Sequence, residues 1–267
     1  MNIYLRELKS NLKSFLIWSG AILFLLLAGM GKYDAGSKME AGSSSMNEMI
    51  QNIPKSMQSI LGVGVFDLGT IIGFYAVMYL YLAIMAAAYA VSLGSGMISK
   101  EERDRTSEFL MVKPITRASV LLDKLLAAVT FCAAFSVVTF IFSIMSFSIY
   151  AKELYALDVT RLCVALFCIQ ICFVSVGFFF ASATGKHKRS TALGLGVMLL
   201  MLIISFVVDI FEQVDALKYF TFFQYFDSKD ILVLGWPVIF PVLAALSCFA
   251  LFTSAFLLYR RRDLRLG

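Results

Sequence analysis

Long runs of apolar residues dominate the chain and are separated by shorter polar segments. A helix needs about 20 apolar residues to cross roughly 30 Å of hydrocarbon, where its backbone polar groups must be satisfied within the helix. Six runs reach this length, at 14–31, 70–97, 122–150, 161–184, 191–211 and 236–259. The pattern predicts an all-α integral membrane protein with six transmembrane helices, forming one domain over residues 1–267.

The second and third runs are longer than a bilayer requires, which indicates tilt or extension beyond the membrane. Small side chains are frequent in the second run, which includes Ala86, Ala87, Ala88, Gly94, Ser95 and Gly96. Small residues let helix backbones approach closely in lipid. We therefore expect the helix over 70–97 to pack tightly against a neighbour.

The first 13 residues have a two-sided pattern on a helical wheel. Arg6, Lys9 and Lys13 gather on one side. The opposite face carries the apolar residues Tyr4, Leu5, Leu8, Leu12 and Phe15. This pattern predicts an amphipathic interfacial helix over 1–13, on the cytoplasmic leaflet with its cations near anionic lipid headgroups. The alternative is an ordinary start of a span with a basic flank. No small-residue cleavage site follows, so we expect no cleavable signal.

Composition agrees with a membrane protein. Hydrophobic residues make up 60% of the chain, charged residues 15%, and the mean hydropathy is +0.84, whereas soluble domains are about 45–50% apolar and about 25% charged. All five cysteines lie in apolar runs, so no disulfide framework is indicated. Cys168 and Cys172 are one helical turn apart, but no His, Asp or Glu stands near them. We expect packing residues there and no metal site.

Charge predicts the orientation. If both termini are cytoplasmic, the inner segments hold 16 of the 23 Lys and Arg residues. Cytoplasmic loops are enriched in these residues, and an even number of spans agrees with such a layout. We expect a multi-pass protein of the cell (inner or plasma) membrane, with Lys186 facing the cytoplasm and the 32–66 loop facing outward.

The polar residues offer no plausible catalytic set. The single histidine, His187, lies among the cations of the 185–189 loop, where we expect it to be solvated near lipid headgroups. No phosphate-binding loop occurs, since Gly185-Lys186 is followed by His187. We therefore expect no enzyme activity in this chain.

Few ionisable residues lie deep in the predicted spans, where each is costly. Gln170 is the only strongly polar side chain near the middle of a span, and is a candidate for a pathway or interhelical contact. Asp123 and Lys124 lie at the inner edge of the third span, and Asp209 near the outer edge of the fifth.

The segment 98–121 between spans two and three is longer than a reversal needs. A charged stretch is followed by apolar residues 109–112, then Pro114 stops the helix and Thr116 is placed to cap the next one. We expect a short cytoplasmic helix with an apolar end, a shape suited to docking into a groove on a partner.

This segment resembles the cytoplasmic signature of ABC-2 type permeases, the type V exporter fold. In that family an acidic residue, a Thr, a leucine, a Pro, an Arg and a Lys recur at about the same spacings. The matching residues here are Glu102, Thr106, Glu108, Leu110, Pro114, Arg117 and Lys124. Phe109 stands where a leucine is common in that family, and Arg105 where a glycine is common. With the six-span layout, the likeness extends over essentially the whole chain.

The resemblance implies the permease subunit of an ATP-binding-cassette exporter, paired with a second permease chain (a homodimer) and with separate ABC ATP-binding subunits. ATP and Mg would then sit on the partner, and this chain would hold no cofactor and bind no nucleic acid. The residues it implies for coupling to the ATPase are Glu101, Glu102, Arg105, Thr106, Glu108, Phe109, Leu110, Pro114 and Arg117.

Other readings stay open. A non-transporting membrane scaffold or signalling subunit, or an intramembrane enzyme, would share the apolar pattern. The aromatic stretch 219–226 is either an interfacial belt or, as in the family it resembles, a linker that dips into the outer leaflet. The low charge of the spans favours an amphiphile or a peptide as the transported molecule.

Overall fold

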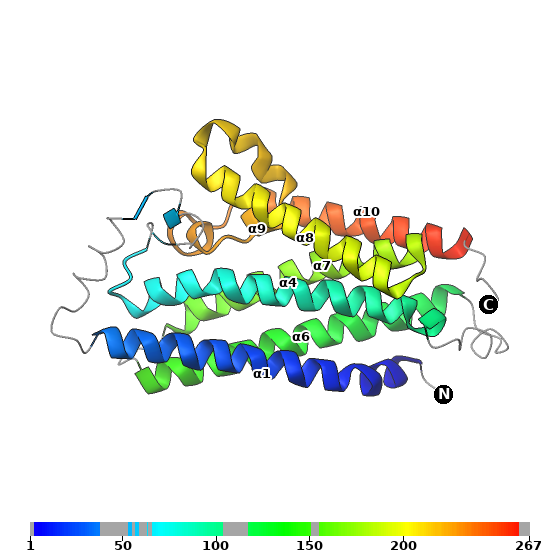
Figure 1. Ribbon diagram of the computed structural model, residues 1–267, viewed down its shortest axis with the longest axis horizontal. Coiled ribbons are helices and arrows are strands. Elements are labelled where there is room, and N and C mark those ends of the chain that lie inside the picture. The colour runs from blue at the N-terminus through cyan, green and yellow to red at the C-terminus, as the bar shows by residue number, and fades with distance from the viewer. Residues whose placement is uncertain are drawn as a thin grey trace.

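The computed structural model describes residues 3–37, 53–54, 57–58, 63, 66–103, 117–150 and 155–261. In these ranges, six helices are long and apolar enough to cross a membrane: α1 (Ile3–Ser37), α4 (Ile71–Arg103), α6 (Arg117–Tyr150), α7 (Ala156–Thr184), α8 (His187–Ile210) and α10 (Ile239–Arg261). They form an elongated bundle of roughly parallel helices (Figure 1). Each corresponds to one predicted span, so the all-α, six-span prediction is confirmed.

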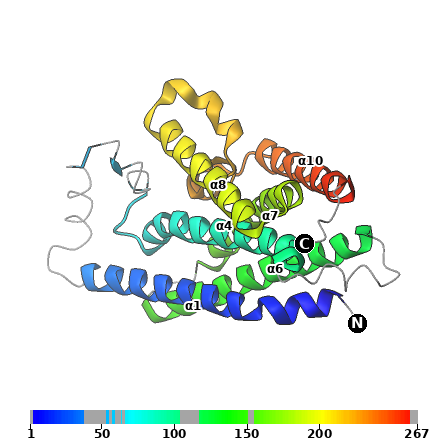
Figure 2. The same ribbon diagram turned by 45° about the vertical axis from the view of Figure 1, so that its right-hand side comes forward.

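The bundle is built around a central pair, α4 and α7, which make the most extensive contact between any two elements. On one side α1 packs along α6, and on the other α8 and α10 pack against the pair, as Figures 1 and 2 show. Most span residues of α4 and α7 are buried, whereas only about a fifth of those in α1, α8 and α10 are. The apolar exposed faces suit contact with lipid.

Two glycines let α4 and α7 approach to backbone contact. A Cβ atom on Gly94 would lie 2.7 Å from the carbonyl oxygen of Val174, and one on Gly177 would lie 2.7 Å from the carbonyl oxygen of Val91. No larger residue fits at these two positions without moving a helix. The expectation that small residues make the second span pack closely is confirmed.

The amino-terminal region differs from the prediction of a separate interfacial helix over 1–13. α1 is continuous from Ile3 to Ser37, and no Gly or Pro precedes Gly20 to break it. Tyr4 and Phe15 pack against the core, and the Tyr4 hydroxyl lies 3.0 Å from that of Thr130 on α6. Leu5 and Leu12 on the same face remain exposed, and the region is the basic start of a long helix and not a separate element.

Short elements connect α8 to α10: η1 (Glu212–Phe220), α9 (Phe222–Tyr225) and η2 (Asp230–Leu234). By contrast, α7 and α8 are joined by a tight reversal, where Gly185 adopts a φ of 68° and its N–H donates to the carbonyl of Ala181. A left-handed residue of this kind ends helices most cheaply when it is glycine.

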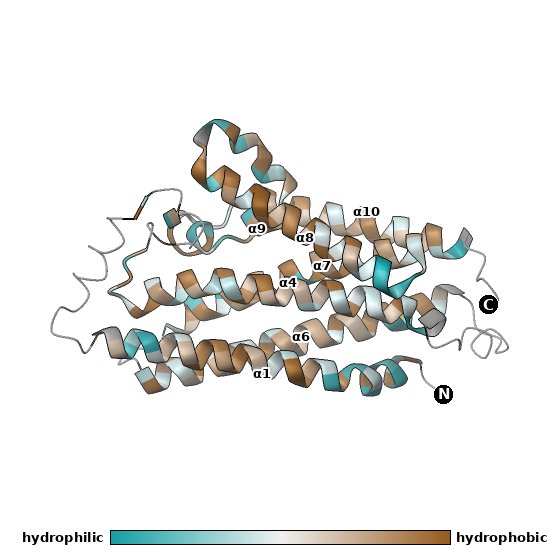
Figure 3. Ribbon diagram, in the orientation of Figure 1, coloured by the Kyte–Doolittle hydropathy of each residue, from teal (hydrophilic) through white to brown (hydrophobic). Residues whose placement is uncertain are grey.

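The two ends of the bundle are polar and its middle is apolar (Figure 3). The same end of the bundle holds the starts of α1 and α6 and the ends of α4 and α10 (Figure 1). We call this the inner end, and the end that carries α9 the outer end.

We predict that Gly177→Ala destabilises the protein by about 1–3 kcal/mol, because the added methyl overpacks two helix backbones. The matched control is Gly196→Ala on α8, where a Cβ meets nothing within 4 Å, and which is expected to leave stability unchanged or raised. Thermal unfolding in detergent, followed by circular dichroism, measures both. Equal midpoints for the two variants would contradict the packing described for α4 and α7.

Candidate functional site

The predicted coupling segment is bracketed by two helices at the inner end. α4 runs on through Glu101 and Glu102 to Arg103, and α6 begins at Arg117. The other residues proposed for coupling lie outside the described residues: Arg105, Thr106, Glu108, Phe109, Leu110 and Pro114. The structure therefore shows how the two ends of the segment are held, and the docking role of the segment stays a prediction.

Lys124 ties these two helices together. Its side chain is buried, and its ammonium donates a hydrogen bond to the backbone carbonyl of Met97. Burying an ammonium is costly unless it is hydrogen-bonded, so the contact fixes the first turns of α6 against the last turns of α4. The contact thus joins the two helix ends that flank the segment.

A second polar cluster joins α1 to the end of α4. Glu7 on α1 is fully buried and forms ion pairs with Arg6 at 3.1 Å and Lys100 at 3.9 Å. Asn11 donates to the Glu7 carbonyl at 2.9 Å, and the Lys100 ammonium donates to the hydroxyl of Ser10. The basic start of α1 thus makes protein contacts as well as carrying charge.

His187 is not a solvated loop residue as predicted. It opens α8, is only partly exposed, and its Nδ1 lies 3.0 Å from the hydroxyl of Ser99 on α4. The tight turn at Gly185 leaves no room for a loop, so the imidazole is brought onto α4. Its neighbour Lys188 remains exposed.

Gln170 lies at the centre of the bundle with no exposed surface. Its Oε1 accepts a hydrogen bond of 3.4 Å from Ser136 on α6, whereas its Nε2 has no hydrogen-bond partner among the described residues. It therefore contacts a neighbouring helix, and a contact with substrate stays a prediction. Nearby, the thiols of Cys172 and Cys248 lie 3.5 Å apart. No group of metal-ligating side chains occurs in the described part of the chain.

The aromatic stretch at the outer end folds back into the bundle. Thr221 donates to the carbonyl of Met201, nine residues before the end of α8, which is about 14 Å along a helix. Phe222 and Phe223 pack on Phe173 of α7, with ring centroids 5.6 and 5.3 Å away. Phe222 and Phe223 are thus buried, whereas Tyr219 and Phe220 of the same stretch are exposed, and the choice between a dipping linker and an interfacial belt stays a prediction.

Gln224 fixes the folded-back stretch to α8. Its Nε2 lies 3.2 Å from the carbonyl and 3.1 Å from the hydroxyl of Ser205, and 2.9 Å from Oδ1 of Asp209. Tyr225 stacks on Phe240 of α10, with ring centroids 5.4 Å apart. The stretch is thus held by polar contacts to one helix and aromatic contacts to two others.

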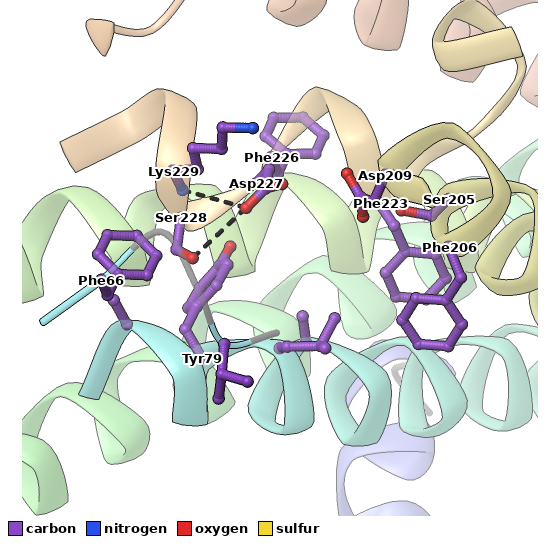
Figure 4. Close-up of a pocket in the computed structure, with 14 residues that line it drawn as sticks. Phe66, Tyr79, Ser205, Phe206, Asp209, Phe223, Phe226, Asp227, Ser228 and Lys229 are labelled. Carbon is purple, nitrogen blue, oxygen red and sulfur yellow. Dashed lines mark hydrogen bonds between the residues drawn. The ribbon is translucent and has the colours of Figure 1, made fainter. Parts of the chain in front are cut away.

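A cavity of about 120 Å³ opens between this stretch, α4 and α8. Its lining includes Tyr79, Phe206, Asp209, Phe223, Phe226 and Asp227 (Figure 4). Oδ1 of Asp227 accepts hydrogen bonds from the backbone N–H of Lys229 at 3.0 Å and the hydroxyl of Ser228 at 3.4 Å. The cavity thus combines carboxylates with aromatic rings at the outer end of the bundle.

Burial raises the pKa of the Asp227 carboxyl above its ordinary value. The N–H of Lys229 lowers this pKa in part, and the nearby Asp209 carboxylate raises it again. Burial also raises the pKa of Asp230, with a further contribution from Asp227. Three carboxyl groups, Asp209, Asp227 and Asp230, thus share one region with Lys229 and Lys218.

The fold, the apolar helices and their polar ends define a multi-pass α-helical membrane protein. A family model described as "ABC-2 family transporter protein" matches residues 1–264. The chain therefore belongs to the ABC-2 family of transporter proteins, a family of membrane permeases of ABC transporters that work with ABC ATP-binding proteins. A comparison with curated proteins gives no match.

Sequence reasoning missed the sites that depend on packing. Glu7 lies among the cations of the first turns in the sequence, and nothing in its position along the chain indicates that it is buried. Tyr79, Asp209 and Asp227 come from three separate regions that meet only because the 219–226 stretch folds back. The one available signal was Asp209, an acidic residue close to the end of an apolar run.

We predict that Gln224→Ala lowers stability by about 1–3 kcal/mol, because it removes a buried donor and leaves its acceptors unpaired. The control is Gln213→Ala, an exposed glutamine in η1, for which less than about 0.5 kcal/mol is expected. Hydrogen exchange over residues 221–226, read with thermal unfolding, should show faster exchange in the first variant only. Unchanged exchange in Gln224→Ala would mean that these hydrogen bonds do not hold the stretch.

Proposed function

We propose that this chain is the membrane-spanning permease subunit of an ABC exporter, driven by a separate ATPase subunit that docks on the 98–121 segment. The observation that carries the proposal is the family match over residues 1–264. The signature-like sequence of the segment and the way its two flanking helices are joined support it.

In this proposal, the inner end transmits a movement of the ATPase subunit to the membrane-spanning helices. A partner that presses on the segment acts on the end of α4 and the start of α6, which Lys124 joins. The Glu7–Lys100 ion pair extends the connection to α1. Because α4 packs backbone to backbone on α7, a shift of α4 displaces the core pair together.

The full transporter in this proposal has two permease chains, which form the pathway as a dimer, and two ABC subunits that bind ATP and Mg. Exposed apolar faces on α1, α8 and α10 are available for lipid and for the second chain. Gln170 is the candidate polar contact along the pathway. The permease chain itself supplies no catalytic residue to ATP hydrolysis.

The proposed orientation places the inner end in the cytoplasm of the cell. Described basic residues gather there, including Lys9, Lys13, Lys188, Arg189 and Arg260, whereas acidic side chains line the outer cavity. This distribution fits the excess of Lys and Arg on cytoplasmic segments. Both chain ends would then be cytoplasmic, on the side where the ATPase resides.

We predict that Phe109→Ala weakens binding of the ATPase subunit by roughly thirtyfold, since a central apolar anchor commonly contributes about 2 kcal/mol or more. The measurement is co-purification of the tagged ATPase with the permease, after equal membrane levels are verified. The matched control is Phe211→Ala, an exposed phenylalanine beyond the outer end of α8. Gln170→Ala is also expected to keep the ATPase.

Full retention of the ATPase and of ATP-dependent activity by Phe109→Ala would refute the docking role. Failure of the wild-type permease to bind or stimulate any ABC ATPase would favour a scaffold or signalling subunit. Because the ATPase is cytoplasmic, loss of binding only in Phe109→Ala also supports the orientation.

A further inference from the structure

The outer cavity contains a polar group that nothing in the described structure satisfies. The Tyr79 side chain is 3% exposed, lines the cavity, and its hydroxyl has no hydrogen-bond partner in the described part of the chain. Figure 4 shows the ring rising from α4 with its hydroxyl toward the turn that carries Asp227 and Ser228. A buried hydroxyl without a partner is costly, so the site is incomplete as it stands.

The walls of the cavity have a distinct chemistry. Aromatic rings come from Phe66, Phe206, Phe223 and Phe226, and carboxylates come from Asp209 and Asp227. Aromatic faces attract organic cations, and carboxylates pair with them. Hard metal cations prefer shells of six or more oxygen atoms, and no group of three or more His, Cys, Asp or Glu side chains that could hold a metal ion occurs in the described part of the chain.

We propose that this cavity binds a primary ammonium group carried by an amphiphile, with Asp227 and Asp209 as counter-ions, Tyr79 as hydrogen-bond acceptor and the phenylalanine rings as its walls.

The size and hydrogen bonding of the cavity favour this occupant. Its volume of about 120 Å³ is several times what one water molecule needs, so a short alkylammonium head has room. The two hydrogen bonds that Asp227 accepts within the described structure both end on Oδ1, which leaves Oδ2 for a ligand. An ammonium with N–H donors reaches both this oxygen and the Tyr79 hydroxyl, whereas a quaternary ammonium has no donor.

The charged groups around the cavity also suit a cationic ligand. Asp209, Asp227 and Asp230 lie near one another, and the cations that act on them are Lys229 and, for Asp230, also Lys218, which pairs with Asp215. Lys229 also lines the cavity, but no ion pair of its ammonium with a carboxylate within 4 Å occurs in the described structure. Lys229 is therefore a neighbour that tunes the site and not its occupant.

Binding does not depend on transport, whereas the role of the site as a place where cargo or lipid engages the permease rests on the proposed function. The site lies at the outer end, where the folded-back aromatic stretch meets α8. An amphiphile held there keeps its ammonium in the cavity and its chain along apolar faces of the bundle. The proposed ligands are therefore amphiphilic primary amines.

The test uses the permease alone, without ATPase or ATP, in nanodiscs of phosphatidylglycerol, a lipid that has no ammonium. Titration calorimetry with n-butylammonium chloride, corrected for empty nanodiscs, measures binding at neutral pH, and 1-butanol serves as the uncharged analogue. We expect saturable binding of n-butylammonium and none of 1-butanol. Butyltrimethylammonium is expected to bind more weakly, since it has no N–H donor.

Asp227→Asn is expected to weaken n-butylammonium binding by about tenfold or more, because it removes a counter-ion. Tyr79→Phe, which keeps the ring and removes only the hydroxyl, should weaken it by about threefold to tenfold and abolish the preference over butyltrimethylammonium. The control Asp215→Asn changes an exposed carboxylate at the same end that pairs with Lys218, and should bind like the wild type. Thermal unfolding verifies that all three variants are folded.

The proposal is wrong if the wild type does not bind n-butylammonium, if 1-butanol binds equally well, or if both Asp227→Asn and Tyr79→Phe bind as the wild type does. A second titration in nanodiscs that contain phosphatidylethanolamine identifies the source of the ammonium. Competition by this lipid assigns the site to a lipid headgroup, and undiminished binding assigns it to a separate amphiphile. Both results require that the cavity binds an ammonium group. Failure of the Phe109 experiment with intact binding here would refute only the proposed ATPase coupling.

Discussion

The backbone contact between α4 and α7 is the constraint on which the rest of the structure depends. Gly94 and Gly177 bring the two helices close enough for carbonyl oxygens to face the opposite Cα positions. In lipid, where apolar association gains little from water exclusion, such van der Waals contact is a main source of helix packing. The other four spans then attach to this pair, and their outer faces are left to lipid.

Both ends of the molecule use polar contacts that begin on this pair. At the inner end, Lys124 and Lys100 bind α6 and α1 to the last turns of α4. At the outer end, the folded-back stretch rests on Phe173 of α7 and closes a cavity over Tyr79 of α4. The continuous helix α4 therefore extends from the segment proposed to meet the ATPase to the cavity proposed to bind an ammonium.

Much of the fold could be predicted because lipid imposes a simple rule on sequence. A span must be long and apolar, so six runs were enough to predict six helices, and small residues such as Gly94 indicated the close contact. The continuity of α1 could not be predicted, because an amphipathic pattern is the same whether its apolar face meets lipid or α6. The contact between His187 and Ser99 and the cavity around Asp227 both depend on how distant segments pack. Neither produces a recognisable local pattern in the sequence.

The most direct test of the central claim, that ATP-driven movement enters through a joined α4 and α6, is the ATPase rate of the assembled transporter with Lys124→Met. This variant keeps the length of the buried side chain and removes its hydrogen bond to Met97. The exposed Lys188→Met is the control. With equal amounts of bound ATPase, the account predicts that Lys124→Met reduces stimulation of ATP hydrolysis by the permease by about fivefold or more, while Lys188→Met does not. Wild-type stimulation by Lys124→Met would contradict it.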